Sequence, residues 1–94
     1  MKDQINYMQP KEKIALMDKI IRELDDVINS QTSVLKKISQ IEAENINLND
    51  SSLSEGLSGI HENVDAALVS CNELKEKFKE VYDGFVAKNP ISEE

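Results

Sequence analysis

The residues of this chain most able to do chemistry are one histidine, one cysteine and scattered carboxylates. The segment His61–Asp65 begins like the helical motif of zinc proteases, in which two histidines four residues apart bind the metal. Asp65 stands in the place of the second histidine, and the chain has no other histidine. The residue types therefore favour a solvated histidine beside the apolar face of a helix, and we expect no metal site.

The other motifs with catalytic potential are also incomplete. Residues 56–59 read Gly-Leu-Ser-Gly, but they lack the lysine and the preceding strand of a phosphate-binding loop. The short acidic pairs Asp25-Asp26 and Glu42/Glu44 lack the glycine and the spacing of a calcium-binding loop. One histidine without a pocket does not support a Ser-His-Asp arrangement. We therefore expect a protein that is not an enzyme and that uses no cofactor and no small-molecule substrate.

Composition narrows the class of partner. A net charge of −7 disfavours nucleic acid, because phosphate contacts need clustered lysine and arginine. The apolar runs are too short to cross a membrane, and the first residues contain no apolar signal core. Cys71 is the only cysteine, so no disulfide can form within the chain. These features predict a cytoplasmic protein, with export by a route that lacks a cleaved signal peptide left open.

Two long helices must position these residues. Between residues 53 and 85, apolar side chains recur at alternating steps of four and three. This spacing keeps side chains on one face of a helix, so we expect the whole series to face a neighbouring helix. The series is Leu53, Leu57, Ile60, Val64, Ala67, Cys71, Leu74, Phe78, Val81 and Phe85.

The N-terminal half predicts a helix with a broader apolar surface. Its main stripe is Ile14, Met17, Ile21, Leu24, Ile28, Gln31, Leu35 and Ile38. A second stripe beside it, with a spacing of seven residues, is Ile20, Val27, Val34 and Ile41. Together the stripes are wider than a two-stranded coiled coil needs, so this helix should contact more than one neighbour. The polar stretch Asn29–Ser33 keeps the apolar phase and predicts a continuous helix, with a kink or a buried Gln31 amide as the alternative.

Local signals place a single domain at residues 10–89. Pro10 suits the first position of a helix, and Ser52–Glu55 has the pattern of a capping box. The second helix should end before Pro90, because the residue preceding a proline avoids the helical region. The predicted segments are a flexible leader at 1–9, a helix at 10–44, a linker at 45–51, a helix at 52–88 and an acidic tail at 90–94.

These elements predict an all-α fold, an antiparallel two-helix hairpin of the coiled-coil type. A hairpin alone leaves part of the broad stripe of the first helix exposed, and an exposed apolar patch marks an interface. The predicted partner interface is Ile20, Val27, Val34, Ile41, Tyr82 and Val86. We expect it to complete a four-helix bundle, either with a second copy as a homodimer or with another helical protein.

One family shares this outline. The chain contains Leu57-Ser58-Gly59, and Tyr82 is followed four residues later by Val86. With its two long helices and acidic balance, it resembles the small helical hairpins of type VII secretion, which carry a Trp-x-Gly motif and a Tyr-x-x-x-Asp/Glu signal, and the helical partners of Leu-x-Gly toxins. The resemblance implies a hairpin fold, a helical partner and export. The chain departs from the family in having no tryptophan and no acidic residue at position 86.

The sequence therefore predicts a non-enzymatic protein–protein interaction module. One setting is a small secreted protein, or a secretion partner, of a type VII-like system. A second is a cytosolic adaptor, chaperone or assembly subunit that binds a partner helix, and a third is an anti-activator or antitoxin-type regulator. In each setting the partner is protein, without nucleic acid and without insertion into a membrane.

Overall fold

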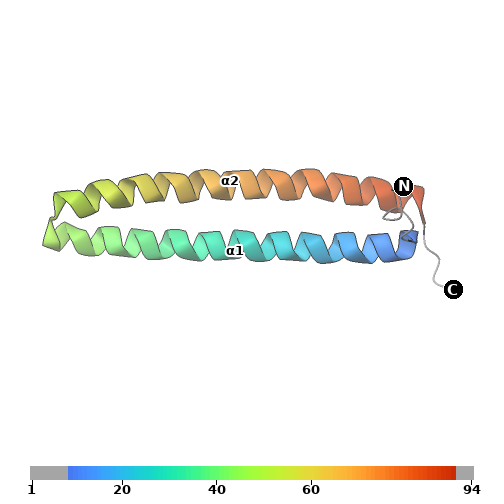
Figure 1. The fold of residues 1–94 in the computed structure, drawn as a ribbon, viewed down its shortest axis with the longest axis horizontal. Coiled ribbons are helices and arrows are strands. Elements are labelled where there is room, and N and C mark those ends of the chain that lie inside the picture. The colour runs from blue at the N-terminus through green and yellow to red at the C-terminus, as the bar shows by residue number, and fades with distance from the viewer. Residues whose placement is uncertain (1–8, 91–94) are drawn as a thin grey trace, which may run out of the picture.

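The computed structural model describes residues 9–90, which form two long α-helices joined by a short turn. α1 (Pro10–Leu48) and α2 (Ser51–Lys88) run antiparallel along each other, with the turn at one end (Figure 1). The predicted all-α antiparallel hairpin is confirmed. The predicted leader and acidic tail lie outside the described residues, apart from Gln9 and Pro90. Within residues 9–90, neither helix has a stretch long and apolar enough to cross a membrane.

α1 is a continuous helix, as predicted. A proline occupies its first position, where the missing N–H costs nothing, and the Glu12 carboxylate accepts a hydrogen bond from the N–H of Gln9 at 3.2 Å. The helix runs without a break through the polar stretch Asn29–Ser33. Within that stretch, the Thr32 hydroxyl donates to the Ile28 carbonyl at 2.9 Å, so its polar group is satisfied inside its own helix.

The turn is much shorter than the linker predicted at 45–51. α1 continues for one further turn beyond its predicted end at Glu44, and only Asn49 and Asp50 separate the two helices. Asn49 has a left-handed backbone (φ 60°, ψ 45°), and its N–H donates to the Asn45 carbonyl at 2.6 Å. Asparagine adopts this conformation more readily than most residues. The asparagine-rich segment therefore ends the helix tightly and does not form a loop.

Asp50 caps the start of α2, in place of the predicted Ser52–Glu55 box. Its carboxylate accepts hydrogen bonds from the Ser52 hydroxyl at 2.7 Å and from the Leu53 N–H at 2.8 Å. A negative charge at this end of a helix is also favoured by the helix dipole. The bonds to the charged form lower the pKa of Asp50 below its ordinary value, with the Ser52 hydroxyl as the larger cause and the Leu53 N–H as the smaller.

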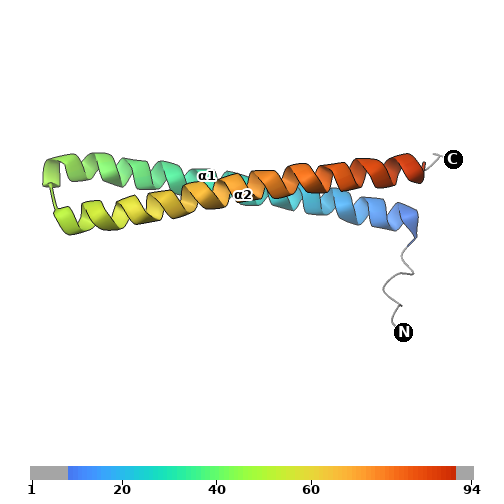
Figure 2. The same ribbon diagram turned by 90° about the horizontal axis from the view of Figure 1, so that it is seen from above.

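Contacts spread along the hairpin fix the register of the two helices. Near the open end, Lys13 Nζ lies 4.9 Å from the centre of the Phe85 ring. Farther along, Lys75 Nζ lies 2.5 Å from the Asp25 carboxylate, and His61 contacts α1 nearer the turn. Seen from above, the helices cross at a shallow angle near their middle (Figure 2). Residues early in α1 therefore face residues late in α2, level by level.

Each helix presents to the other a row of buried or half-buried side chains, its contact stripe. The stripe of α1 is the predicted one, extended toward the turn: Ile14, Met17, Ile21, Leu24, Ile28, Gln31, Leu35, Ile38, Glu42 and Asn45. The stripe of α2 is Leu57, His61, Val64, Leu68, Cys71, Lys75, Phe78, Tyr82 and Phe85.

The contact stripe of α2 contains only part of the predicted series. Ile60, Leu74 and Val81 are 46%, 54% and 56% exposed, although the apolar spacing predicts that they face α1. The residues one position later, including His61 and Lys75, are half-buried in their place. Both of these polar side chains have a carboxylate partner on α1. A polar group with a partner can occupy a contact position, which an apolar pattern alone does not predict.

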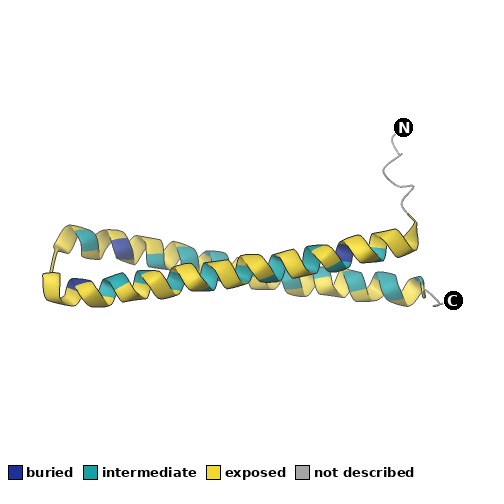
Figure 3. Ribbon diagram, turned by 90° about the horizontal axis from the view of Figure 1, so that it is seen from below, coloured by how far each residue is buried: buried dark blue, intermediate teal, exposed yellow. Residues whose placement is uncertain are grey.

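The two helices bury little apolar surface between them. Among residues 9–90, the apolar side chains that are buried outright are Met17 and Leu57, at 7% and 5% exposed. Exposed positions run along both helices, and buried positions are few (Figure 3). Long helices in proteins owe most of their stability to packing of an apolar face. A hairpin with so thin a core is therefore expected to be marginally stable by itself.

Candidate interaction surface

The residues singled out for chemistry serve to join the two helices. His61 Nδ1 lies 3.1 and 3.2 Å from the two carboxylate oxygens of Glu42, and both side chains are about two-thirds covered. The sequence predicts a solvated histidine beside the apolar face of a helix, whereas the structure places His61 on the contact stripe, with its side chain still 37% exposed. Cys71 is half-buried on the contact stripe. Across residues 9–90, no group of three or more His, Cys, Asp or Glu side chains is placed to hold a metal ion.

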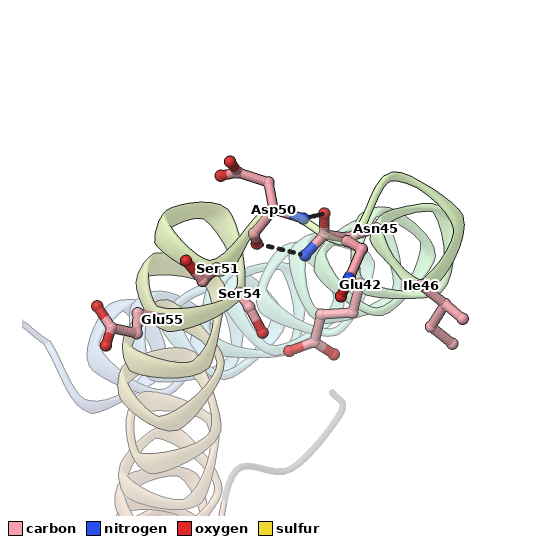
Figure 4. A pocket seen from close by; sticks show the side chains of 8 residues that line it. Glu42, Asn45, Ile46, Asp50, Ser51, Ser54 and Glu55 are labelled. Carbon is pink, nitrogen blue, oxygen red and sulfur yellow. Dashed lines mark hydrogen bonds between the residues drawn. The ribbon is translucent and has the colours of Figure 1, made fainter.

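A shallow hollow at the turn is lined by polar side chains from both helices (Figure 4). Asn45 spans it: its Nδ2 donates to the Asp50 carbonyl and its Oδ1 accepts from the Asp50 N–H, both at 3.1 Å. Asn45 is only 8% exposed, and both ends of its amide are bonded. The polar groups of this hollow thus hold the turn together, and the carboxylates of Glu42 and Glu55 lie at its edge.

The contact stripes divide the hairpin into two long faces. The two-fold axis that relates the helices of an antiparallel pair is perpendicular to the plane that contains them, so equivalent positions of both helices lie on the same face. Each contact stripe alternates between the a and d positions of a heptad repeat. The g positions, one residue before each a position, lie on one face of the hairpin. The e positions, one residue after each d position, lie on the opposite face.

One of these, the apolar face, has no polar side chain along its centre. Its members are Ile20, Val27, Val34 and Ile41 of α1, and Ile60, Ala67, Leu74 and Val81 of α2. The register pairs them across the hairpin, from Ile20 with Val81 near the open end to Ile41 with Ile60 near the turn. Val27 is 43% exposed, and several members of α2 are more exposed. An exposed apolar patch of this extent marks an interaction site.

The opposite, polar face carries polar side chains at its four central levels and the apolar residues Ile46 and Val86 at its two ends. Its central members are Asp18, Asp25, Thr32 and Ser39 of α1, and Ser58, Asp65, Asn72 and Lys79 of α2. Asp25 is paired with Lys75 of α2, and Asp18 lies 2.7 Å from Arg22 one turn later. Such exposed ion pairs add little stability, but together with water they satisfy the polar groups. The centre of this face therefore offers no apolar side chain to a partner.

The structure brings together four of the six predicted interface residues. Those on the apolar face are Ile20, Val27, Val34 and Ile41. Tyr82 lies on the contact stripe against α1, and Val86 lies on the polar face, both half-buried. The sequence reasoning missed the four apolar-face residues of α2, because it assigned them to packing within the chain: Ile60, Ala67, Leu74 and Val81. Their spacing of seven residues matches that of the second stripe of α1, and this match is the signal that could have identified them.

Two glycines border the apolar face on its α2 side. Gly56 and Gly84 lie in the outer row next to the apolar residues, with Ser70 midway between them in sequence. A Cβ added at either glycine would meet nothing within 4 Å. Glycine inside a helix costs about 1 kcal/mol relative to alanine, and no contact within residues 9–90 requires it at these positions. The same row contains Asn63 and Lys77, so its small residues allow another backbone to approach closely only at the two ends and the centre of the row.

No protein-family model, no curated protein and no solved structure matches this chain. The geometry of the hairpin therefore carries the functional interpretation.

Proposed function

We propose that this chain is a non-enzymatic protein–protein interaction module whose apolar face packs against the helices of a partner. The observation that carries the proposal is the contrast between the two faces: the centre of one is apolar at four successive levels, and the other is polar at the same levels. Two helices with one apolar face have the composition of half a four-helix bundle, in which each helix buries a broad stripe.

The small core of the hairpin supports this proposal. Among residues 9–90, the apolar side chains that are buried outright are Met17 and Leu57. An interface of ordinary size removes about 800 Å² from each partner. Covering the apolar face would supply the core that the hairpin lacks.

Three settings suit a module of this kind. A secretion partner of a type VII-like system would pair with another helical protein before export. A cytosolic adaptor, chaperone or assembly subunit would hold the helix of its client, and an antitoxin-type regulator would cover the binding helix of its target. Leu57 of the Leu-Ser-Gly segment is 5% exposed and packs against α1, so this segment does not favour export over the other settings.

The test is site-specific photo-crosslinking in cells that express the chain. A benzoylphenylalanine placed at Val27 on the apolar face should form protein adducts on irradiation, because this side chain is held against the partner. The same probe placed at Ser39 on the polar face is the matched control, and it should give none. Leu74→Glu, in the chain that carries the probe at Val27, should abolish the adducts, because it puts a charge into the same contact.

Equal adduct yields from the two probe positions would refute the proposal, and so would adducts from Val27 that survive Leu74→Glu. The mass of the adduct then tells whether the partner is the chain itself or a different protein.

A further inference from the structure

We propose that the partner is a second copy of this chain, stacked apolar face to apolar face with its turn pointing in the opposite direction. This inference rests on the proposed function and adds the identity and orientation of the partner. A two-fold axis lies between the two apolar faces and crosses the helices at right angles. In this arrangement α1 lies against α1 of the second copy and α2 against its α2, each pair antiparallel.

The apolar face is centred so that one such axis serves both helices. A two-fold interface requires the same patch to match itself after reversal. The four apolar-face residues of α1 lie symmetrically about the level of Ser30, and the four of α2 about the level of Ser70. Because the register pairs Val27 with Leu74, these two centres lie at the same height along the hairpin. Reversal therefore returns every apolar level to another apolar level.

Side-chain sizes also match after reversal. Ala67 of one copy faces Leu74 of the second copy, so a small side chain leaves room for a large one, as close packing requires. In the outer row, Gly56 faces Gly84 of the second copy. An added Cβ at either glycine meets nothing within 4 Å among residues 9–90, and this placement gives both glycines a role in the close approach of the two α2 helices.

The charge distribution favours the reversed orientation over a parallel one. The half of the hairpin nearer the turn, residues 31–69, carries two lysines against six carboxylates. The other half, residues 9–30 and 70–90, carries eight basic against nine acidic residues. Reversal sets each acidic half over the nearly neutral half of the second copy, whereas parallel stacking sets the two acidic halves together. It also brings Glu23, in the outer row of α1, opposite Lys37 of the second copy, twice by symmetry.

Single cysteines on the proposed axis test both the partner and its orientation. The background is Cys71→Ala, checked for unchanged helical content by circular dichroism, with Cys71→Ser as the substitute if alanine lowers it. In this background Ser70→Cys places two thiols opposite each other in the reversed dimer, within the separation that a disulfide needs. Ser30→Cys does the same on α1. Ser39→Cys, on the polar face, is the matched control.

We expect each axial variant to form a disulfide-linked dimer on mild oxidation about tenfold or more faster than Ser39→Cys, because the assembled dimer holds its thiols at an effective concentration in the millimolar range. If Ser70→Cys and Ser30→Cys crosslink only when mixed with each other, the parallel orientation is correct and the proposed one is overturned. If the uncrosslinked chain is monomeric at every concentration, self-pairing is overturned. Adducts with a different protein from the probe at Val27 would then leave the proposed function standing, and their absence would remove both.

Discussion

The two long faces of this hairpin belong to the same helices and lie one residue to either side of the same contact stripes. On the polar face, Asp25 pairs with Lys75, and the Thr32 hydroxyl and the Asn72 amide each donate to a carbonyl of their own helix. On the apolar face, side chains such as Val27 and Leu74 remain 43% and 54% exposed. Polar groups of one face have partners within the hairpin, whereas the exposed parts of the apolar side chains of the other face have none among the described residues. Under the proposed function, the stability of the hairpin depends on the partner that covers the apolar face.

The magnitude of that dependence follows from the exposed side chains. Burying the exposed half of a valine, leucine or isoleucine side chain stabilises a protein by about 1 kcal/mol. Val34 and Ile60 are 44% and 46% exposed, Val27, Leu74 and Val81 are 43%, 54% and 56% exposed, and the remaining members of the face are half-buried. Their sum is several kcal/mol per chain, a large fraction of the roughly 5–15 kcal/mol that stabilises a typical domain.

The largest expected effect comes from placing an aspartate on the contact stripe and comparing it with an aspartate on the apolar face. Val64→Asp puts an unpaired charge between the helices and should destabilise the hairpin by on the order of 3 kcal/mol or more, enough to unfold so thin a structure. Leu74→Asp puts the same charge at a position that is 54% exposed, so the helices should still form. Circular dichroism at low concentration measures both, and we expect helical content to be lost only in Val64→Asp.

The dependence of the melting temperature on protein concentration tests the role of Leu74 further. The melting temperature of the unmodified chain should rise with protein concentration, whereas that of Leu74→Asp should not, because association no longer stabilises it. Equal loss of helical content in the two variants would mean that Leu74 belongs to the packing within the chain. The two faces would then not differ as described.

Leu74 and its neighbour Lys75 show how far the sequence alone predicts the structure. The spacing of apolar residues identifies two helices, their antiparallel order and five of the residues of α2 that face α1: Leu57, Val64, Cys71, Phe78 and Phe85. For the contact position between Cys71 and Phe78, the apolar pattern favours Leu74. The structure instead places Lys75 there, because Asp25 lies within reach on α1.

The candidate surface was half predictable for this reason. The second stripe of α1 stands beside a complete contact stripe, so the sequence marks Val27 and Val34 as surplus apolar residues. On α2, the surplus residues complete an uninterrupted apolar series, so only their match to the seven-residue spacing of the second stripe of α1 could distinguish them from core. The sequence also predicts the end of α1 wrongly. The Asn45 side chain and the Asn49 backbone close α1 at the turn. Their contacts depend on Asp50, and so on the geometry of both helix ends.

The smallest expected effect concerns the turn, which belongs to neither face. Hydrogen bonds from the Ser52 hydroxyl and the Leu53 N–H lower the pKa of Asp50 in the folded chain. The stability that they add is present above the unfolded-state pKa and is lost as the pH falls through the lowered, folded-state pKa. Asp50→Ala should therefore lower the melting temperature at neutral pH, and this difference from the unmodified chain should shrink in acid.

Asp50→Asn is the control for that measurement, because asparagine keeps a capping oxygen but does not titrate. Neither substitution should change the mass of the assembly at neutral pH, since neither touches the apolar face. A change in association without a change in melting temperature would show that the turn takes part in the interface. The interface would then extend beyond the apolar face.

The measurement that tests the central claim most directly is the absolute mass of the chain by light scattering on a size-exclusion column, over a series of concentrations. The unmodified chain should show twice its 10.6 kDa mass at higher concentration. Val27→Glu should remain at the mass of one chain, and Ser39→Glu should behave as the unmodified chain. A mass of one chain at every concentration would contradict the pairing of two copies, and a dimer that Val27→Glu leaves intact would contradict the assignment of the apolar face as the interface.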